Sequence, residues 1–463
     1  MNRQLRICMV GYRGNMHCGG QGVYIWFLVR ELAKLGHQVD VLVGPPFPDP
    51  MPFAREVVTL PNQQFWAKWF SRDWVHFLPR PNPLRVFEPL NFYELASSRL
   101  GFLPEPFAFS LRALRAMAER LRRGVRYDLV HDVQCLGYGL LGIRAFGFPM
   151  VTTIHHPLTV DRRASLVRDQ TMIDAIGTMQ FYPIGMQSFV ARRMDRVLTS
   201  SRASGREILR DFGVRRDRLE MVGNGLDTQL YSPDPAVRRS EREILCVGRA
   251  SDPNKGIRTL IAALARLASP VRLTLVDDGA PGNEARKWAS SLGCADRLHV
   301  TGRIPTDALV HLYRRAALVV VPSRYEGFGL PAAEAMACGT PVVATSAGAL
   351  PEVMGVGNGG LLVPPDDPEA LAKAIATLLE QPDTRREMGI RAHPLIEAAF
   401  SWPRVAERTA QIYREVVGER SPPYAEARLL GRPARTTTSA RVGTRRASQS
   451  RLRSASSATA PGR

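Results

Sequence analysis

The chain has 463 residues, of which 45% are hydrophobic and 23% are charged, with 38 glycines and 35 prolines. At about 150 residues per domain, this length predicts two or three domains, and the composition excludes a disordered or fibrous protein. The formal net charge is +19, and residues 421–463 hold nine arginines against one glutamate. The strong positive charge favours an anionic partner: a phosphate-bearing ligand, an anionic membrane surface or nucleic acid.

Cysteine usage and apolar runs indicate the compartment. The six cysteines are scattered without Cys-x-x-Cys pairs, which predicts reduced, structural thiols in a cytoplasmic protein. Residues 1–10 hold one short apolar run, and the longest apolar stretch, 135–152, is interrupted by Arg144 and several glycines. We therefore expect neither an export signal nor a bilayer-spanning helix, so that any contact with the inner face of the membrane is peripheral.

Short apolar runs alternate with helical patterns along the chain, which is typical of parallel βα units. The first series of predicted strands covers 5–10, 39–43, 129–133, 150–154 and 196–200. The second series covers 243–247, 272–276, 298–300, 318–321 and 341–344. The fold class predicted is therefore α/β, with two doubly wound domains that bind ligands in the cleft between the carboxyl ends of their strands.

The same patterns suggest domain boundaries. We expect an acceptor-side domain over 1–223, a linker rich in Gly, Pro, Asp and Ser over 224–242, and a second domain over 243–402. A last helix is expected over 403–420. Residues 421–463 have almost no large apolar side chains, so we expect a disordered tail.

An aromatic-rich segment, about 61–110, resembles an insertion over the edge of the first domain's cleft. Twelve of the chain's 35 aromatic residues lie here, including Trp66, Trp69 and Trp74. These rings would either bind an apolar or glycan acceptor by stacking or pack as a separate cluster on their own domain. In the helical pattern that follows, several arginines lie opposite an apolar face, which is found both in helices bound to anionic membranes and in ordinary solvated helices.

A glycine-rich turn follows the first predicted strand. Gly19-Gly20-Gln21-Gly22 precedes an amphipathic helix predicted over 23–35. Exposed N–H groups at a helix N-terminus attract phosphate, and glycine lets the anion approach closely. The alternative is a turn needed only for tight packing of the strand against the helix.

Two cations follow the first strand of the second series. Arg249 ends the motif Val-Gly-Arg, and Lys255 precedes Gly256. The chain has only five lysines against 57 arginines, so a lysine here is unusual, and a compact ammonium group suits a crowded phosphate. Together the two cations would neutralise a diphosphate, although each could also be an ordinary surface charge.

Two glutamates, Glu326 and Glu334, are spaced eight residues apart after the predicted strand 318–321. The first lies in a glycine-containing loop, and the second falls within the helix that follows. The N–H groups of Phe328, Gly329 and Leu330 precede that helix and offer a second anion or hydroxyl site. Carboxylates accept hydrogen bonds from vicinal hydroxyls, which favours a sugar and a ribose as ligands over a simply capped helix with exposed glutamates.

These motifs, spread over about residues 6–417, resemble the retaining GT-B glycosyltransferases of family 4, also called glycosyl transferases group 1. The resemblance also includes Thr153-Ile154-His155 and Asn224-Gly225-Leu226-Asp227. It implies two Rossmann-like domains, a nucleoside-diphosphate sugar held mainly by the second, a glycan or lipid-linked acceptor held by the first, and a final helix that returns to the first domain.

The resemblance implies roles for individual residues. Arg249 and Lys255 would bind the diphosphate, Glu334 the ribose, Glu326 the donor sugar, and His155 the sugar or the reaction centre. The expected catalytic residues are therefore His155, Arg249, Lys255 and Glu326. The expected donor-binding residues are Gly19, Gly20, Arg249, Lys255, Arg303, Ile304, Glu326, Gly327, Phe328, Gly329, Leu330 and Glu334. Of these, Arg303 and Ile304 would contact the base through their backbone.

The resemblance also implies retention of anomeric configuration without a metal or other cofactor. No two aspartates lie two positions apart, so the Asp-x-Asp pattern that binds a divalent ion in other glycosyltransferases is absent. The two cations would instead stabilise the charge that grows on the leaving diphosphate. One departure is that His155 is followed by a second histidine, His156, and either could point into the cleft.

Three other functions are compatible with parts of the sequence. One is a GT-B enzyme that isomerises or phosphorolyses sugars. Another is a non-catalytic sugar-nucleotide-binding protein. Such a protein would have less need for the full set of polar residues, which are His155, Arg249, Lys255, Glu326 and Glu334. A nucleic-acid-binding protein is the most remote, because the basic tail lacks interleaved aromatic residues. The nucleotide, the sugar and the acceptor are not specified by these motifs.

Overall fold

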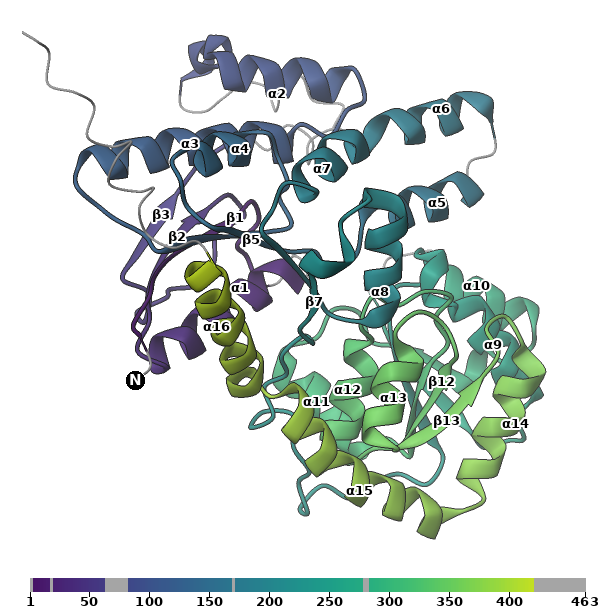
Figure 1. Cartoon of the computed structure of the whole chain (residues 1–463). Helices are drawn as coiled ribbons and strands as arrows, with labels where there is room; N and C mark the ends of the chain where they lie inside the picture. The colour runs from purple at the N-terminus through teal and green to yellow at the C-terminus, as the bar shows by residue number, and fades with distance from the viewer. Residues whose placement is uncertain (1–2, 17–19, 63–81, 169–170, 278–282, 420–463) are drawn as a thin grey trace, which may run out of the picture.

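The computed structural model describes residues 3–16, 20–62, 82–168, 171–277 and 283–419. Figure 1 shows two α/β units, one built from the first half of the chain and one from the second, with helix α16 (Trp402–Glu419) beside the first unit. The α/β fold class with two parallel sheets, predicted from the sequence, is confirmed. The predicted tail, Gly19 and the three tryptophans of the aromatic-rich segment lie outside the described residues.

The first sheet has seven parallel strands in the order β3-β2-β1-β4-β5-β6-β7. Its strands are β1 (Arg6–Gly11), β2 (Gln38–Val43), β3 (Glu56–Thr59), β4 (Leu129–Val133), β5 (Met150–Thr153), β6 (Arg196–Thr199) and β7 (Leu219–Met221). Its helices are α1 (Gly20–Lys34), α2 (Pro89–Arg99), α3 (Glu105–Arg122), α4 (Gly139–Ala145), α5 (Leu158–Arg168), α6 (Met172–Phe181), α7 (Ile184–Ala191) and α8 (Arg202–Glu207). The two strands at the edges, β3 and β7, were not predicted, because neither contains a continuous apolar run.

The second sheet has six parallel strands in the order β10-β9-β8-β11-β12-β13. Its strands are β8 (Glu243–Val247), β9 (Arg272–Val276), β10 (Leu298–Val300), β11 (Leu318–Val321), β12 (Val342–Thr345) and β13 (Gly360–Val363). Its helices are α9 (Ile257–Arg266), α10 (Glu284–Ser291), α11 (Thr306–Arg315), α12 (Leu330–Ala337), α13 (Leu350–Gly357), α14 (Pro368–Leu379) and α15 (Pro382–Phe400). Both sheets order their strands as doubly wound folds do, so the carboxyl ends of the central strands face the space between the units.

Helix α16 packs on the first unit although it follows the second in sequence. Trp402 stacks on Phe27 of α1 with ring centroids 5.2 Å apart, and Tyr413 is bonded through its hydroxyl to buried His131 of β4. A Cβ atom on Gly225 would lie 2.1 Å from the Trp402 ring, so only glycine allows the chain between the units to pass this closely. The helix therefore ties the end of the second unit to the core of the first.

The helix expected to carry a free basic face is partly engaged within its own unit. In α3, Arg112 donates to Glu94 of α2 at 2.6 Å, and that carboxylate is buried. Arg112 therefore contributes to the packing of α2 on α3 and is not part of a free cationic surface.

Within the described residues, no helix is both long enough and apolar enough to span a bilayer.

Candidate active site

The loops after β8 and β11 bring one predicted cation, Lys255, and the first glutamate, Glu326, to one place. After β8 the chain turns at Gly256, whose φ is +62° and whose absent side chain leaves room for the carbonyl oxygen of Pro322, 1.9 Å from a Cβ atom at that position. This close approach brings the short helical turn that carries Lys255 against the loop that follows β11. The aliphatic part of Lys255 lies along the backbone of Gly248.

Lys255 and Glu326 form a partly buried ion pair. The Lys255 Nζ donates to Glu326 Oε1 at 2.7 Å, and Ser323 Oγ donates to the same oxygen at 2.9 Å. Burial disfavours the charge on Lys255, but Glu326 outweighs this effect and raises the pKa of the lysine. The lysine is therefore charged at neutral pH. Both hydrogen bonds reach Oε1, and within the described residues Oε2 receives none.

Glu334 lies on α12 and lines a cavity of about 480 Å³ between the two units. Gly20, the first residue of α1, lines the same cavity from the other unit, and a Cβ atom at Gly20 would meet no atom within 4 Å. Tyr313 donates to Glu334 Oε2 at 2.7 Å. Burial raises the pKa of Glu334, and hydrogen bonds from Tyr313 and Tyr231 counteract that rise. The volume of the cavity, about 480 Å³, lies in the range of small-molecule sites, which are about 300–1,000 Å³.

The two histidines after β5 lie in different surroundings. The ring of His155 meets that of Tyr24 edge-on, with centroids 4.9 Å apart, and burial lowers its pKa to about 4, with an added effect from His156. His155 is therefore neutral at pH 7. His156 Nε2 lies 3.1 Å from Asp161 Oδ2. Burial opposes the charge on His156, but Asp161 and, more weakly, Glu326 outweigh it and raise its pKa.

The loop that carries Glu326 forms hydrogen bonds directly with the first unit. The carbonyl oxygen of Gly327 accepts hydrogen bonds from Ser201 Oγ at 2.7 Å and from Ser204 Oγ at 3.1 Å. Glu352 of α13 accepts the N–H groups of residues 202 and 203 at the start of α8, both at 2.8 Å. Sequence reasoning missed these contacts, because nothing in the spacing of isolated serines shows that they meet a loop more than 120 residues away.

The remaining predicted donor residues occupy distinct positions. Phe328 is buried and packs edge-on against Phe400 with centroids 5.0 Å apart, whereas Leu330 lines the cavity that holds Glu334. Arg249 and Arg303 are exposed and Ile304 is half-buried. Gly329 has a φ of +96° and is the N-cap residue directly before α12. The structure thus pairs Lys255 with Glu326 and places Gly20 and Glu334 on the wall of one cavity. It leaves Arg249 and Arg303 without a side-chain partner among the described residues.

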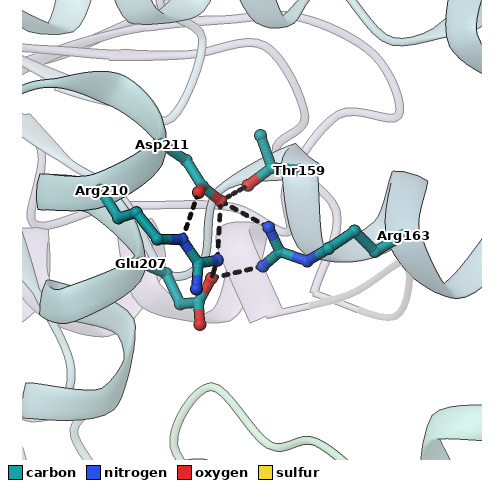
Figure 2. Close-up of polar contacts among 5 residues, drawn as sticks. All are labelled: Thr159, Arg163, Glu207, Arg210 and Asp211. Atoms are coloured by element: carbon teal, nitrogen blue, oxygen red, sulfur yellow. Dashed lines mark hydrogen bonds and ion pairs between the residues drawn. The ribbon is translucent and has the colours of Figure 1, made fainter.

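Helix α5, which follows the two histidines, is anchored by a network of charges. Figure 2 shows the Asp211 carboxylate between Arg210, Arg163 and the hydroxyl of Thr159. Arg163 and Arg210 also pair with Glu207. Burial disfavours the Asp211 charge, but hydrogen bonds from Arg210, Thr159 and Arg163 outweigh it and lower its pKa to about 2. The start of α5 is thereby fixed to α8 and the helical turn that follows it.

We expect Asp211→Asn to destabilise the protein by about 1–2 kcal/mol at pH 7, after allowance for solvent screening of this network. Because the folded pKa lies below the unfolded value of 3.8, the stabilisation is fully present above pH 4 and is lost as the pH falls towards 2. Urea unfolding at pH 7, 5 and 3.5 measures the difference. Asp217→Asn, at an exposed pair with Arg215, is the control and should change little; a pH-independent loss for Asp211→Asn would contradict the charge network.

The arrangement can bind a ligand that has a diphosphate at one end and hydroxyl groups at the other. A charged lysine beside a carboxylate with one free oxygen matches a phosphate next to a sugar hydroxyl. A second carboxylate in a cavity shared by both units matches another pair of hydroxyls. Because the groups come from both units, a ligand would be enclosed only when the units are close together.

Two family models match the chain. The one described as Glycosyltransferase Family 4 matches residues 18–230, and the one described as Glycosyl transferases group 1 matches residues 227–393. The two matches meet at the chain that passes between the units. They confirm the resemblance found in the sequence.

Relatives and solved structures agree with this assignment. The chain is 38% identical to "MMP alpha-(1->4)-mannosyltransferase" of Mycolicibacterium hassiacum, over 89% of this chain and 98% of the relative. It is 32% identical to "D-inositol 3-phosphate glycosyltransferase" of Acidothermus cellulolyticus, over 87% of each chain. The structure of sucrose-phosphate synthase from Thermosynechococcus elongatus superposes with a TM-score of 0.66 and 26% identity, over 90% of this chain and all of that one.

Proposed function

The chain belongs to the group 1, family 4 type glycosyltransferases, and we propose that it transfers a mannosyl residue from a nucleoside-diphosphate sugar to a hydroxyl of a glycan or lipid-linked acceptor. We further propose that the reaction retains the anomeric configuration and needs no metal ion. The mannosyl assignment is supported by the relative named as a mannosyltransferase, which is similar over nearly its whole length.

The contact between Lys255 and Glu326 is the observation that carries this proposal. A donor bound here would place its diphosphate at the ammonium group and a sugar hydroxyl at Glu326 Oε2. As the glycosidic bond breaks, negative charge grows on the leaving phosphate, and a fixed cation stabilises that charge more than it stabilises the bound donor. Arg249, exposed at the end of β8, is the second cation of this proposal.

Retention follows from where the acceptor proton would go. If the acceptor hydroxyl attacks from the face that the diphosphate leaves, a phosphate oxygen lies within reach of its proton, and no base on the opposite face is needed. His155, neutral at pH 7 because of its burial, would then act as a hydrogen-bonding group towards the sugar. In this scheme the cations supply the stabilisation that a bound metal gives in other glycosyltransferases.

The proposed donor can be identified by ligand screening followed by transfer assays. Guanosine, uridine and adenosine diphosphates are first compared by thermal stabilisation, because a ligand at a hundred times its Kd adds about 2.7 kcal/mol. The mannose and glucose derivatives of the stabilising nucleotide are then tested with mannoside and lipid-linked acceptors. Transfer of mannose in preference to glucose is the expected result. Transfer of glucose alone would overturn the mannosyl assignment and leave the family unaffected.

The proposed ribose contact of Glu334 gives a further prediction. We expect Glu334→Gln to weaken binding of the bare nucleoside diphosphate and of the nucleotide sugar alike, by about 10- to 150-fold, because each carries the ribose. Calorimetric titration of both ligands measures this. A 2′,3′-dideoxynucleotide should bind the variant and the unaltered protein equally. If the variant binds the natural nucleotide with unchanged affinity, the ribose contact is ruled out.

A further inference from the structure

Gln134 occupies an unusual backbone conformation directly after β4. Its φ is +54°, and that of Leu136 is +51°. Residues other than glycine seldom adopt this left-handed region, because the side chain then strains the backbone. Such strain persists only where surrounding contacts hold it, and it is found disproportionately at functional sites.

The surrounding contacts come from a buried aspartate at the end of β4. The Asp132 carboxylate accepts the N–H groups of Cys135 and Leu136, each at 3.3 Å, and the hydroxyl of Thr152 of β5 at 2.8 Å. Asp132 is fully buried. The turn over residues 134–136 is therefore fixed to both central strands and does not depend on a ligand for its shape.

This turn directs the Gln134 side chain at the backbone of the two histidines. Its Oε1 accepts the N–H of His155 at 2.9 Å, and its Nε2 donates to the carbonyl oxygen of His156 at 3.0 Å. The paired register of β4 and β5 ends at Val133 and Thr153. Beyond that point the backbone of β4 turns away, and the Gln134 amide supplies the donor and acceptor that the next residues of a strand would have offered.

The turn formed by His155 and His156, here called the histidine turn, lies directly against the loop that carries Glu326. A Cβ atom on Gly327 would lie 3.3 Å from the carbonyl oxygen of His155 and 3.5 Å from the Cβ of His156. A displacement of the histidine turn would therefore change its distance to the loop of the other unit that carries Glu326. Displacements of about 1 Å at a reaction centre can lower a rate by about 100-fold.

We infer that Gln134 is a positioning residue for glycosyl transfer: its amide holds the His155–His156 turn at the distance from the Glu326 loop that the reaction requires. The inference rests on the proposed place of this turn beside the donor sugar. Gln134 itself touches the backbone of the turn and acts through the histidines. Nucleotide binding, which we propose to depend mainly on residues of the second unit, should not need it.

Two variants at Gln134 test this role. Gln134→Met keeps the length of the side chain and removes both hydrogen bonds, and it should lower kcat/KM by about 10- to 100-fold. Gln134→Glu keeps the acceptor for the His155 N–H, but an ionised carboxylate would face the His156 carbonyl oxygen. Only the protonated carboxyl can donate there as the amide does. Burial raises the pKa of such a carboxyl, so the activity of Gln134→Glu relative to the unaltered enzyme should rise as the pH falls from 8 to 5.5.

The controls separate positioning from loss of structure. Gln187→Met removes another buried amide, 1% exposed on α7 against 4% for Gln134, and should retain activity. The Kd of the nucleoside diphosphate should stay within about 3-fold of the unaltered value in all three variants. Equal kcat/KM for Gln134→Met and the unaltered enzyme would overturn the inference, as would a ratio for Gln134→Glu that does not change with pH.

Parallel measurements on His155→Ala and His156→Ala keep this inference distinct from the proposed function. If the histidine variants lose activity and the Gln134 variants do not, the amide has no positioning role and the proposed site stands. If neither histidine variant loses activity, the turn is not part of the reaction centre, and both the inference and the proposed role of His155 are wrong.

Discussion

Replacing Lys255 by alanine should lower kcat/KM with the true donor by about 100- to 1,000-fold, which is the usual loss when one charge-stabilising donor is removed from an active site. The variant removes the ammonium group that we propose to bind the leaving diphosphate, and it also leaves Glu326 without its charge partner at 2.7 Å. Steady-state kinetics at saturating acceptor measures the loss. The fold should persist, because Lys255 is half-buried and belongs to neither of the apolar clusters of the second unit.

A matched control separates this local effect from the overall charge. Lys373→Ala removes another of the chain's five lysines, one that is exposed on α14, and should leave the kinetics unchanged. Thermal unfolding of both variants reports whether either is destabilised. If Lys255→Ala keeps near-normal kcat/KM, the diphosphate does not bind at this lysine.

The second large effect is expected for Glu326→Gln, and it should depend on the sugar. The two hydrogen bonds from Lys255 and Ser323 reach one oxygen of Glu326, which leaves the other for a hydroxyl of the donor sugar. The variant should bind the bare nucleoside diphosphate nearly normally. It should bind the nucleotide sugar about 10- to 150-fold more weakly, because one charged hydrogen bond is worth about 1.5–3 kcal/mol.

Calorimetric titration with both ligands measures the sugar-dependent part directly. Glu369→Gln, at an exposed position on α14, controls for the change in net charge. Equal losses for the two ligands in Glu326→Gln would mean that Glu326 acts on the diphosphate through Lys255, and the proposed sugar contact would be wrong.

Much of the architecture was predictable because both sheets are parallel and buried on both faces. Their central strands are therefore mostly apolar, as at 318–321, and their predicted bounds agree with the structure within one or two residues. The strands at 56–59 and 360–363 were not predicted, because the first has only two apolar residues and the second has only three, after a glycine. Candidate site residues at the ends of the central strands could also be named from the sequence, because phosphate and hydroxyl recognition requires particular residue types at particular spacings. Their roles stay predictions.

The contacts that connect the two units could not be predicted from spacing. The hydroxyls of Ser201 and Ser204 bind the carbonyl oxygen of Gly327, and any serine in the chain has the same hydrogen-bonding groups. Tyr313 and Tyr231 form hydrogen bonds with Glu334, but in the sequence they cannot be distinguished from ordinary core tyrosines. Gln134 could not be identified from the sequence either, because its proposed role depends on a left-handed backbone conformation that glutamine seldom adopts. Such residues become visible only when the distances between elements are known.

We propose that the protein's own cations, without a metal, drive transfer with retention. The most direct test is to let the enzyme transfer its sugar from an α-linked nucleotide donor in the presence of excess EDTA, and to determine the anomeric configuration of the product by NMR. We expect an α-linked product, formed at the same rate with and without EDTA. A β-linked product, or activity that EDTA abolishes and Mn²⁺ or Mg²⁺ restores, would contradict it.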